Sequence, residues 1–184
     1  MAHYVMVCEG TYPVMPIKEG PLLGGWRLGT VISDQSPQPL RYILNVDYEG
    51  DTKAMYQAEA VPLMRDDVIA ALTKAGVDNV QYFDAVVVNP KTGDEYRNYK
   101  AFNIVGLVAA ADMQQSRVMG GSTSTMGDVD FDELFIDETK ARGHLFFRLA
   151  ECISAIVVDE PVRGAIEAAA IPGFVFYGPG EWSG

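Results

Sequence analysis

The sequence predicts an α+β fold, a mixed and largely antiparallel sheet with a long central hairpin and two short helices packed on it. Two observations predict this class. β-rich runs on both sides of residues 89–94 have the pattern of a hairpin. Two segments, 66–75 and 160–170, space their apolar residues as helices do and are followed by glycine or by proline and glycine. Such helices bury an apolar stripe, and the sheet formed by the strands supplies the surface on which they pack.

Length and composition favour a single domain. A chain of 184 residues can bury about 68–70% or more of its unfolded surface. Its 48% hydrophobic and 21% charged residues are globular values. We expect residues 1–60 to form an irregular, β-leaning N-terminal part of the same domain. We expect residues 61–184 to form its α+β part.

The charge balance restricts the class of partner. The chain has 25 acidic and 14 basic residues, a net charge of −11. Nucleic acids and anionic membrane surfaces are bound by clustered Lys and Arg, so neither is expected as a partner. A basic protein is compatible, because opposite fields speed encounter. The same charge also serves plain solubility. The sequence does not indicate an oligomeric state.

The cysteines and the N-terminus predict a cytoplasmic protein. Cys8 and Cys152 are far apart, and both lie in apolar surroundings, so we expect buried free thiols in a reducing compartment. The first residues lack a basic region followed by a long apolar stretch, so no secretory signal is expected. The apolar runs of the chain are much shorter than a membrane span.

The N-terminal part is expected to contain the strands 4–8 and 42–46. Residues 10–21, with three prolines and two glycines, are predicted to be a loop. Residues 22–29 are glycine-rich but fit neither the dinucleotide fingerprint nor the P-loop, so we interpret them as a turn around Trp26.

The first helix is predicted after Arg65. Asp66 or Asp67 can cap its N-terminus, and Gly76 ends it as a left-handed residue would. The hairpin then follows, with a β-branched strand at 83–88 and a turn at 89–94 that contains proline and glycine.

The second strand of the hairpin is expected to run from Tyr96 to Ala111. From Ile104 onwards it is apolar without alternation, which is typical of a strand that is covered on both faces. We therefore place it near the middle of the sheet. Gly106 marks a bulge or a close approach of the backbone.

Residues 114–127 have no period and are predicted to be a surface loop. The run Gly-Gly-Ser-Thr-Ser-Thr can offer backbone amides to an anion, but no lysine accompanies it. Residues 128–138 carry six carboxylates in eleven residues. Their Asp-x-Asp-x-Asp start resembles a calcium loop, yet Glu133 stands where that loop needs glycine. We interpret the segment as a solvated strand edge that carries a negative patch.

The remaining chain is predicted to form strands at 145–149, 153–158 and 174–177. Asp159, Glu160 and Pro161 open the second helix, and Pro172-Gly173 stops it. Its buried stripe is expected to comprise Val162, Ile166, Ala169 and Ala170. Residues 61–85 and 156–177 share one order of features, an apolar run, an acidic cap, a helix and a β-rich run. We interpret this echo as the ordinary pattern of helices that pack on a sheet.

No motif identifies catalysis, a metal or a cofactor, and none is assigned. His3 and His144 lack metal-ligand spacing to a cysteine or to each other, and no nucleophile elbow is found. His144 could pair with Glu151 or Asp137 as a general acid or base, but a turn histidine without a catalytic role is the simpler interpretation.

From Val61 to the C-terminus, the chain resembles the Imm11 family of bacterial immunity proteins. The segments that carry the likeness are 61–64, 68–72, 75–82, 89–96, 99–106, 145–151, 156–158 and 172–173. The resemblance implies a cytoplasmic, non-enzymatic antitoxin, encoded beside a toxin of a polymorphic toxin system, that binds this cognate toxin. Some toxins linked to the family look like nucleases, and a nuclease surface is often basic.

The resulting hypothesis is an immunity protein that neutralises its toxin by occlusion. Carboxylates would steer the encounter, and aromatic anchors would supply affinity. The candidate steering residues are Asp128, Asp130, Asp132 and Glu133. The candidate anchors are Trp26, Tyr177 and Trp182, for which packing in the core or tail is the alternative. Two other functions stay open, an enzyme or small-molecule-binding domain with an unmarked pocket and an interaction module without a toxin. A cleft that holds His144 beside a carboxylate would favour the former.

Overall fold

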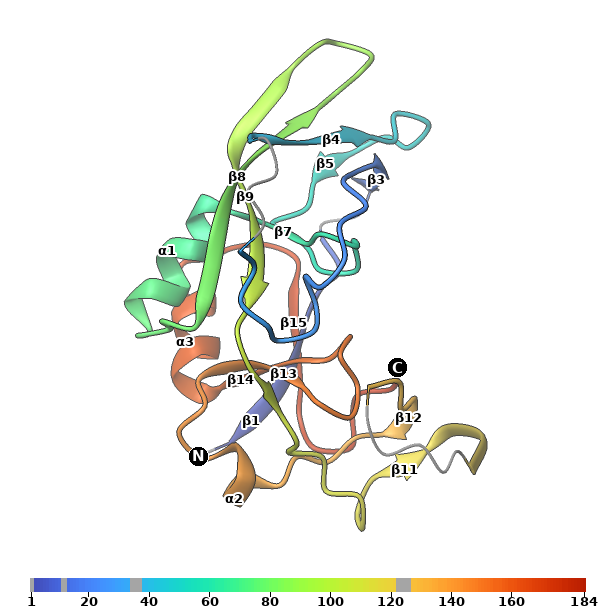
Figure 1. Ribbon diagram of the computed structural model, residues 1–184, viewed down its shortest axis with the longest axis vertical. Coiled ribbons are helices and arrows are strands. Elements are labelled where there is room, and N and C mark those ends of the chain that lie inside the picture. Colours follow the sequence, from blue (N-terminus) through green and yellow to red (C-terminus); the bar gives the residue numbers. More distant parts are fainter. Residues whose placement is uncertain (1, 11–12, 34–37, 122–126) are drawn as a thin grey trace.

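Two mixed sheets form the frame of the molecule, and each carries one helix (Figure 1). The computed structural model describes residues 2–10, 13–33, 38–121 and 127–184. The predicted α+β class is confirmed, but the expected single sheet is divided into two. The strand orders are β3-β4-β8-β9-β7-β6 and β10-β13-β14-β1-β15.

The bounds of the elements are as follows. The six-stranded sheet contains β3 (Ile17–Glu19), β4 (Leu40–Leu44), β6 (Met55–Tyr56), β7 (Leu63–Arg65), β8 (Val80–Val88) and β9 (Glu95–Ile104). The five-stranded sheet contains β1 (His3–Cys8), β10 (Leu107–Val108), β13 (Phe146–Leu149), β14 (Ile156–Asp159) and β15 (Phe174–Tyr177). Two strand pairs are β2 (Val14–Met15) with β5 (Asp51–Thr52), and β11 (Arg117–Val118) with β12 (Phe131–Glu133). The helices are α1 (Asp66–Lys74), α2 (Glu138–Ala141), α3 (Glu160–Ala168) and the 3₁₀ turn η1 (Met119–Gly121).

The predicted hairpin is confirmed and lies in the middle of the six-stranded sheet, with its tip projecting from the body (Figure 1). Its second strand ends at Ile104 rather than at Ala111. Gly106, with φ 94°, turns the chain out of this sheet, and β10 pairs with β13 at the edge of the other. The expectation of one continuous strand was wrong because an unbroken apolar run fits burial in either sheet.

The same strand–helix–strand arrangement occurs twice, once around each of the two longer helices. In one half, β7 and β8 both pair antiparallel with β9, and α1 connects them. In the other half, β14 and β15 both pair antiparallel with β1, and α3 connects them. Each half is therefore a split β–α–β unit with an antiparallel strand between two parallel ones. The echo between residues 61–85 and 156–177 corresponds to these two units.

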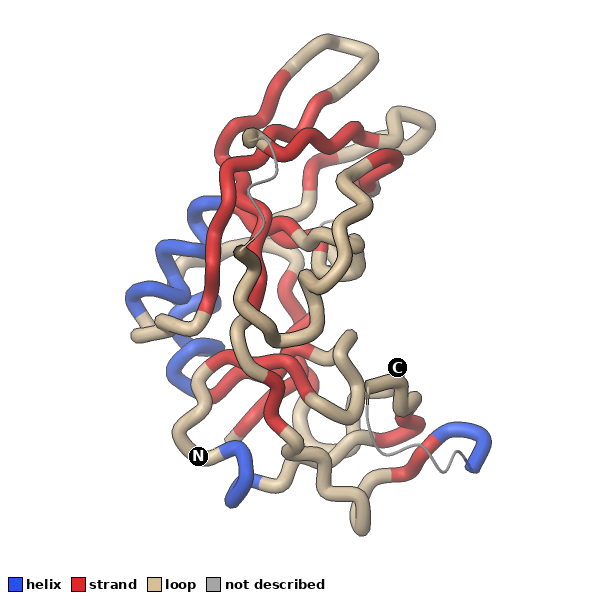
Figure 2. Tube along the Cα trace, viewed as in Figure 1, coloured by secondary structure: helices blue, strands red, loops and turns tan. Residues whose placement is uncertain are grey.

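Helices α1 and α3 lie side by side along one side of the molecule (Figure 2). Helix α1 contacts β7 and β9, while α3 contacts β14 and β1. The N-cap residue of α1 is Arg65 and not an aspartate, and it makes no side-chain cap hydrogen bond. Asp67 does accept a backbone N–H at the start of the helix, from Val68 at 2.9 Å, and its carboxylate also binds the Arg65 guanidinium at 2.6 Å. Gly76, with φ 90°, follows the end of α1 as predicted, whereas Ala169 and Ala170 are exposed just beyond the end of α3. None of the described helices is long and apolar enough to cross a membrane.

Some segments predicted to be loops contain short strands. Residues 10–21 contribute β2 and β3, and residues 114–127 contribute β11 and η1. Two- or three-residue strands lack enough sequence for a period to be seen. The serine–threonine run at 122–125, considered as an anion cradle, lies outside the described residues.

Three hydrophobic clusters fill the space around the sheets. The first lies under both helices and joins the two sheets. The second covers the other face of the five-stranded sheet, and the third covers the other face of the six-stranded sheet. Alternation along a strand divides its side chains between clusters, so that Phe146 of β13 belongs to the first and Phe147 to the second.

The place where the sheets meet is closed by the loop that follows Trp26. The Gly106 backbone N–H donates to the Gly29 carbonyl oxygen at 2.7 Å, which fulfils the expected close approach at Gly106. Gly29 itself has φ 71°. A methyl group added there would lie 2.9 Å from the carbonyl carbon of Gly106.

Gly29→Ala is therefore expected to destabilise the protein. Left-handed strain at a non-glycine residue costs about 1–3 kcal/mol, and the close backbone contact adds to it. Gly24→Ala is the matched control, because its methyl group would have no atom within 4 Å. Urea unfolding measures both variants, and equal stability of the two would contradict this account of the contact.

Candidate functional site

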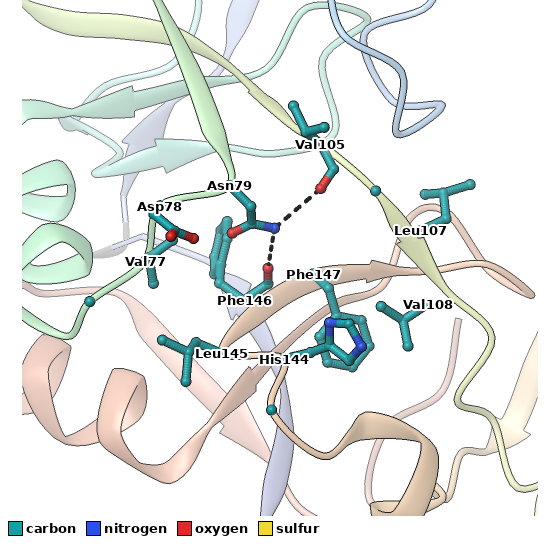
Figure 3. Close-up of a pocket in the computed structure, with 13 residues that line it drawn as sticks. Val77, Asp78, Asn79, Val105, Leu107, Val108, His144, Leu145, Phe146 and Phe147 are labelled. Carbon is teal, nitrogen blue, oxygen red and sulfur yellow. Dashed lines mark hydrogen bonds between the residues drawn. The ribbon is translucent and has the colours of Figure 1, made fainter.

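A cleft of ≈ 430 Å³ opens where the two sheets meet (Figure 3). Its walls are the loop after α1, the crossover from β9 to β10, and the segment that enters β13. Asn79 ties these walls together. Its Nδ2 donates to the Phe146 carbonyl oxygen at 2.9 Å and to that of Val105 at 3.3 Å. The Val105 N–H donates back to the Asn79 carbonyl oxygen at 2.8 Å. This amide holds the scaffold in place and presents no free reactive group to the cleft.

A neighbouring cleft of ≈ 240 Å³ shares Gly143, His144 and Leu145 with the first. Two buried polar residues line it, His3, which is 4% exposed, and Asp159, which is 2% exposed. Both Glu138 oxygens bind His3. Oε2 lies 2.7 Å from Nδ1, and Oε1 accepts from the His3 backbone N–H at 3.0 Å. The other ring nitrogen, Nε2, lies 3.2 Å from the His144 carbonyl oxygen. Both partners of the ring are acceptors, so a proton on either ring nitrogen has an acceptor within reach.

This arrangement fastens strand β1 to helix α2. Both ring nitrogens of His3 are engaged by these contacts, so the ring serves to hold the two elements together. The structure does bring the two histidines together around Phe147, with ring centroids 6.0 and 5.7 Å from it. Sequence reasoning could not find this contact, because His3 lies far from His144 and Phe147 along the chain.

The pairs considered for His144 are not formed. Asp137 caps α2, accepting from the backbone N–H groups of Thr139 and Lys140. A further hydrogen bond from the Thr139 hydroxyl is the main cause that lowers the pKa of Asp137. Glu151 is buried, and burial raises the pKa of its carboxyl. In the smaller cleft, Glu138 binds His3 and Asp159 caps α3 by accepting from the Val162 N–H. Asp78 lines the larger cleft together with His144, but no hydrogen bond between these two described residues is found. Across the described part of the chain, no group of three His, Cys, Asp or Glu side chains is arranged to hold a metal ion.

The predicted acidic residues lie on the strand pair β11–β12 and the residues that lead into it, which we call the acidic ribbon (117–118 and 128–133). Val129 and Phe131 are buried, so the aspartates that alternate with them along the chain point outward. Asp128 and Asp130 are exposed.

The acidic ribbon differs from the predicted strand edge in two ways. Strand β12 is covered on both sides, by β11 and by the C-terminal tail, where Phe131 and Gly184 exchange hydrogen bonds of 2.8 and 3.0 Å. In addition, Arg117 forms ion pairs with Asp132 at 3.3 Å and with Glu133 at 3.1 Å. Two of the four predicted steering carboxylates are thus partly neutralised. A toxin-binding role for the four residues remains a prediction.

Two exposed methionines accompany the acidic ribbon, and sequence reasoning missed both. Met113 is 39% exposed, and Met119, whose N–H donates to the Asp130 carbonyl oxygen, is 45% exposed. The signal that could have found them is the position of these large apolar residues at the two ends of a polar segment.

The aromatic candidates belong to two different clusters, Trp26 to the third and Trp182 to the second, against which Tyr177 also packs. Trp26 is 3% exposed and packs edge-on against Phe83, and Trp182 is 8% exposed beneath the acidic ribbon. The packing alternative therefore describes both tryptophans. Tyr177 is half-buried, and its hydroxyl donates to Glu9 at 3.0 Å. This hydrogen bond raises the pKa of Tyr177.

Comparison with known protein families matches residues 69–180 to the immunity protein family Imm11. The match covers more than half of the chain, which therefore belongs to the Imm11 immunity protein family. The predicted resemblance is confirmed. A search of curated proteins gave no match. The matched range contains the hairpin, the acidic ribbon and α3, and it excludes β1 and Trp26.

Glu138→Gln is expected to loosen the attachment of β1. Hydrogen bonds to charged groups contribute about 1.5–3 kcal/mol, but Glu138 is 44% exposed, so a loss of about 1 kcal/mol is expected. Glu19→Gln makes the same charge change at an exposed position and should be neutral. Urea denaturation followed by circular dichroism measures the difference. Unchanged stability of both variants would refute a role of this contact in fastening β1.

Proposed function

We propose that this Imm11 protein binds a cognate toxin and neutralises it by covering the working surface of the toxin, with the acidic ribbon as the binding face. Membership of an immunity protein family, over residues 69–180, is the observation that carries the proposal. The mechanism is occlusion, in which the immunity protein acts through contact and needs no chemistry of its own.

The acidic ribbon has the composition of a surface that recognises a basic protein. Its exposed aspartates extend a molecule whose net charge is −11, so a basic partner is attracted from a distance. Exposed charges of this kind mainly accelerate association. Met113 and Met119 offer polarizable, adaptable apolar contacts beside them, which suits the water-excluding centre of an interface. A basic toxin, such as a nuclease, is the partner that fits this surface.

Arg117 makes the direction of the electrostatic effect on toxin association testable. It is 64% exposed and sits between two carboxylates of the acidic ribbon. A basic toxin is repelled by this cation and attracted by the carboxylates. Removal of the cation and removal of the carboxylates should therefore change the association rate in opposite directions.

The double variant Asp130→Asn/Asp132→Asn is expected to slow association with the toxin severalfold at low salt, and Arg117→Gln is expected to accelerate it. Surface charges steer association through a field that salt screens, so both effects should shrink as salt is added. The measurement is binding kinetics at several salt concentrations, with an inactive form of the toxin that the neighbouring reading frame encodes.

Asp94→Asn/Glu95→Gln is the matched control, since it removes two acids at the hairpin tip, far from the acidic ribbon (Figure 1). An equal effect of this control would mean that only net charge matters and would reject the assigned face. Co-expression with the active toxin tests the function separately. Wild-type protein that neither binds the toxin nor protects the cell would reject neutralisation itself.

A further inference from the structure

Arg148 is a fully buried cation without a counter-charge. It lies on β13 with 0% exposure, on the same face of the strand as Phe146. Its Nη1 donates to the Ile153 carbonyl oxygen at 2.8 Å. Its Nε and Nη2 have no hydrogen-bond partner. An arginine presents five N–H donors and normally stays charged, so most of this donor set is unused.

The loop that carries Arg27 lies next to the strand of Arg148, because Gly29 of this loop lies against Leu107, the register partner of Arg148 on β10. The Arg27 side chain is half-buried, and its Nε is buried without a partner. Burial, and then the charge of Arg27, lower the pKa of Arg148 to about 9. None of the ion pairs found among the described residues includes either arginine. The loop of Arg27 and the strand of Arg148 are thus neighbours, and neither guanidinium group is ion-paired with a carboxylate of the described residues.

The loop that carries Arg27 is fixed on both sides of this residue. Trp26 before it is packed against Phe83. Beyond it, the Gly29 carbonyl oxygen accepts from Gly106, and the carbonyl oxygen of Thr30 accepts from Asn103 Nδ2 at 2.8 Å. Since Ile153 also holds Arg148, the two cations are positioned before any ligand arrives. Pre-positioned donors lose little freedom on binding.

We propose that Arg27 and Arg148 form a binding site for one small oxyanion, a phosphate or a carboxylate. Unpaired buried charge is strongly unfavourable, and an oxyanion supplies both the counter-charge and the acceptors for the unused N–H groups. The guanidinium fork matches the two oxygens of such a group. The ligand enters from the half-buried Arg27. This site is separate from the acidic ribbon, and the inference does not depend on toxin binding.

The test is thermal unfolding of the whole chain during titration with inorganic phosphate or with acetate, at an ionic strength held constant with chloride. Wild-type protein is expected to gain stability saturably with at least one of the two anions, because a ligand that binds the folded state stabilises it. The anion that gives saturation at the lower concentration identifies the source of the oxyanion group. Arg148→Met should weaken the apparent affinity at least tenfold.

Two further variants keep the result interpretable. Arg27→Met leaves β13 untouched and should weaken the affinity as well, so the test stands if Arg148→Met fails to fold. Arg97→Met removes an exposed arginine of the hairpin and should respond as the wild type does. A rise that does not saturate, or that is the same in all variants, is a general salt effect and would overturn the proposal. So would a wild-type protein that does not respond to either anion.

Discussion

The departure of the chain from the six-stranded sheet at Gly106 is the constraint on which the rest of the structure depends. The chain leaves the centre of one sheet after β9 and continues as β10 at the edge of the other, so the two sheets are joined by backbone and share the cluster under α1 and α3. Asn79 and Gly29 hold the junction from two sides. The larger cleft and the loop that carries Arg27 both lie against this junction, and their geometry follows from it.

The split β–α–β unit of the five-stranded sheet is assembled from both ends of the chain. Its middle strand, β1, comes from the start of the chain, while its outer strands and its helix come from the end. The range that matches the immunity protein family contains β14, α3 and β15 but lacks β1. Within this fold, the matched range by itself would leave a gap in the middle of the five-stranded sheet. The N-terminal strand is therefore an integral part of the architecture around the matched segment.

Features encoded over a few neighbouring residues could be predicted from the sequence, and those that depend on distant contacts could not. The turn after Val88 and the end of α1 at Gly76 are local, and the sequence indicated both of them. The division into two sheets is not local, because burial of an apolar run does not identify its neighbour. In the same way, the contact of His3 with Glu138 and the cover that Gly184 gives to β12 join residues far apart in the chain. The polar Arg148 within an apolar strand was visible in the sequence, but its missing counter-charge required the fold.

The position of β1 in the chain determines how late in synthesis the five-stranded sheet can form. Strand β1 is synthesised first, but both of its neighbours, β14 and β15, are synthesised last. The five-stranded sheet can close only after β15 has been made, and pairing across so long a stretch of sequence is slow. The surfaces that rest on this sheet, helix α3 on one face and the cluster beneath the acidic ribbon on the other, therefore form late.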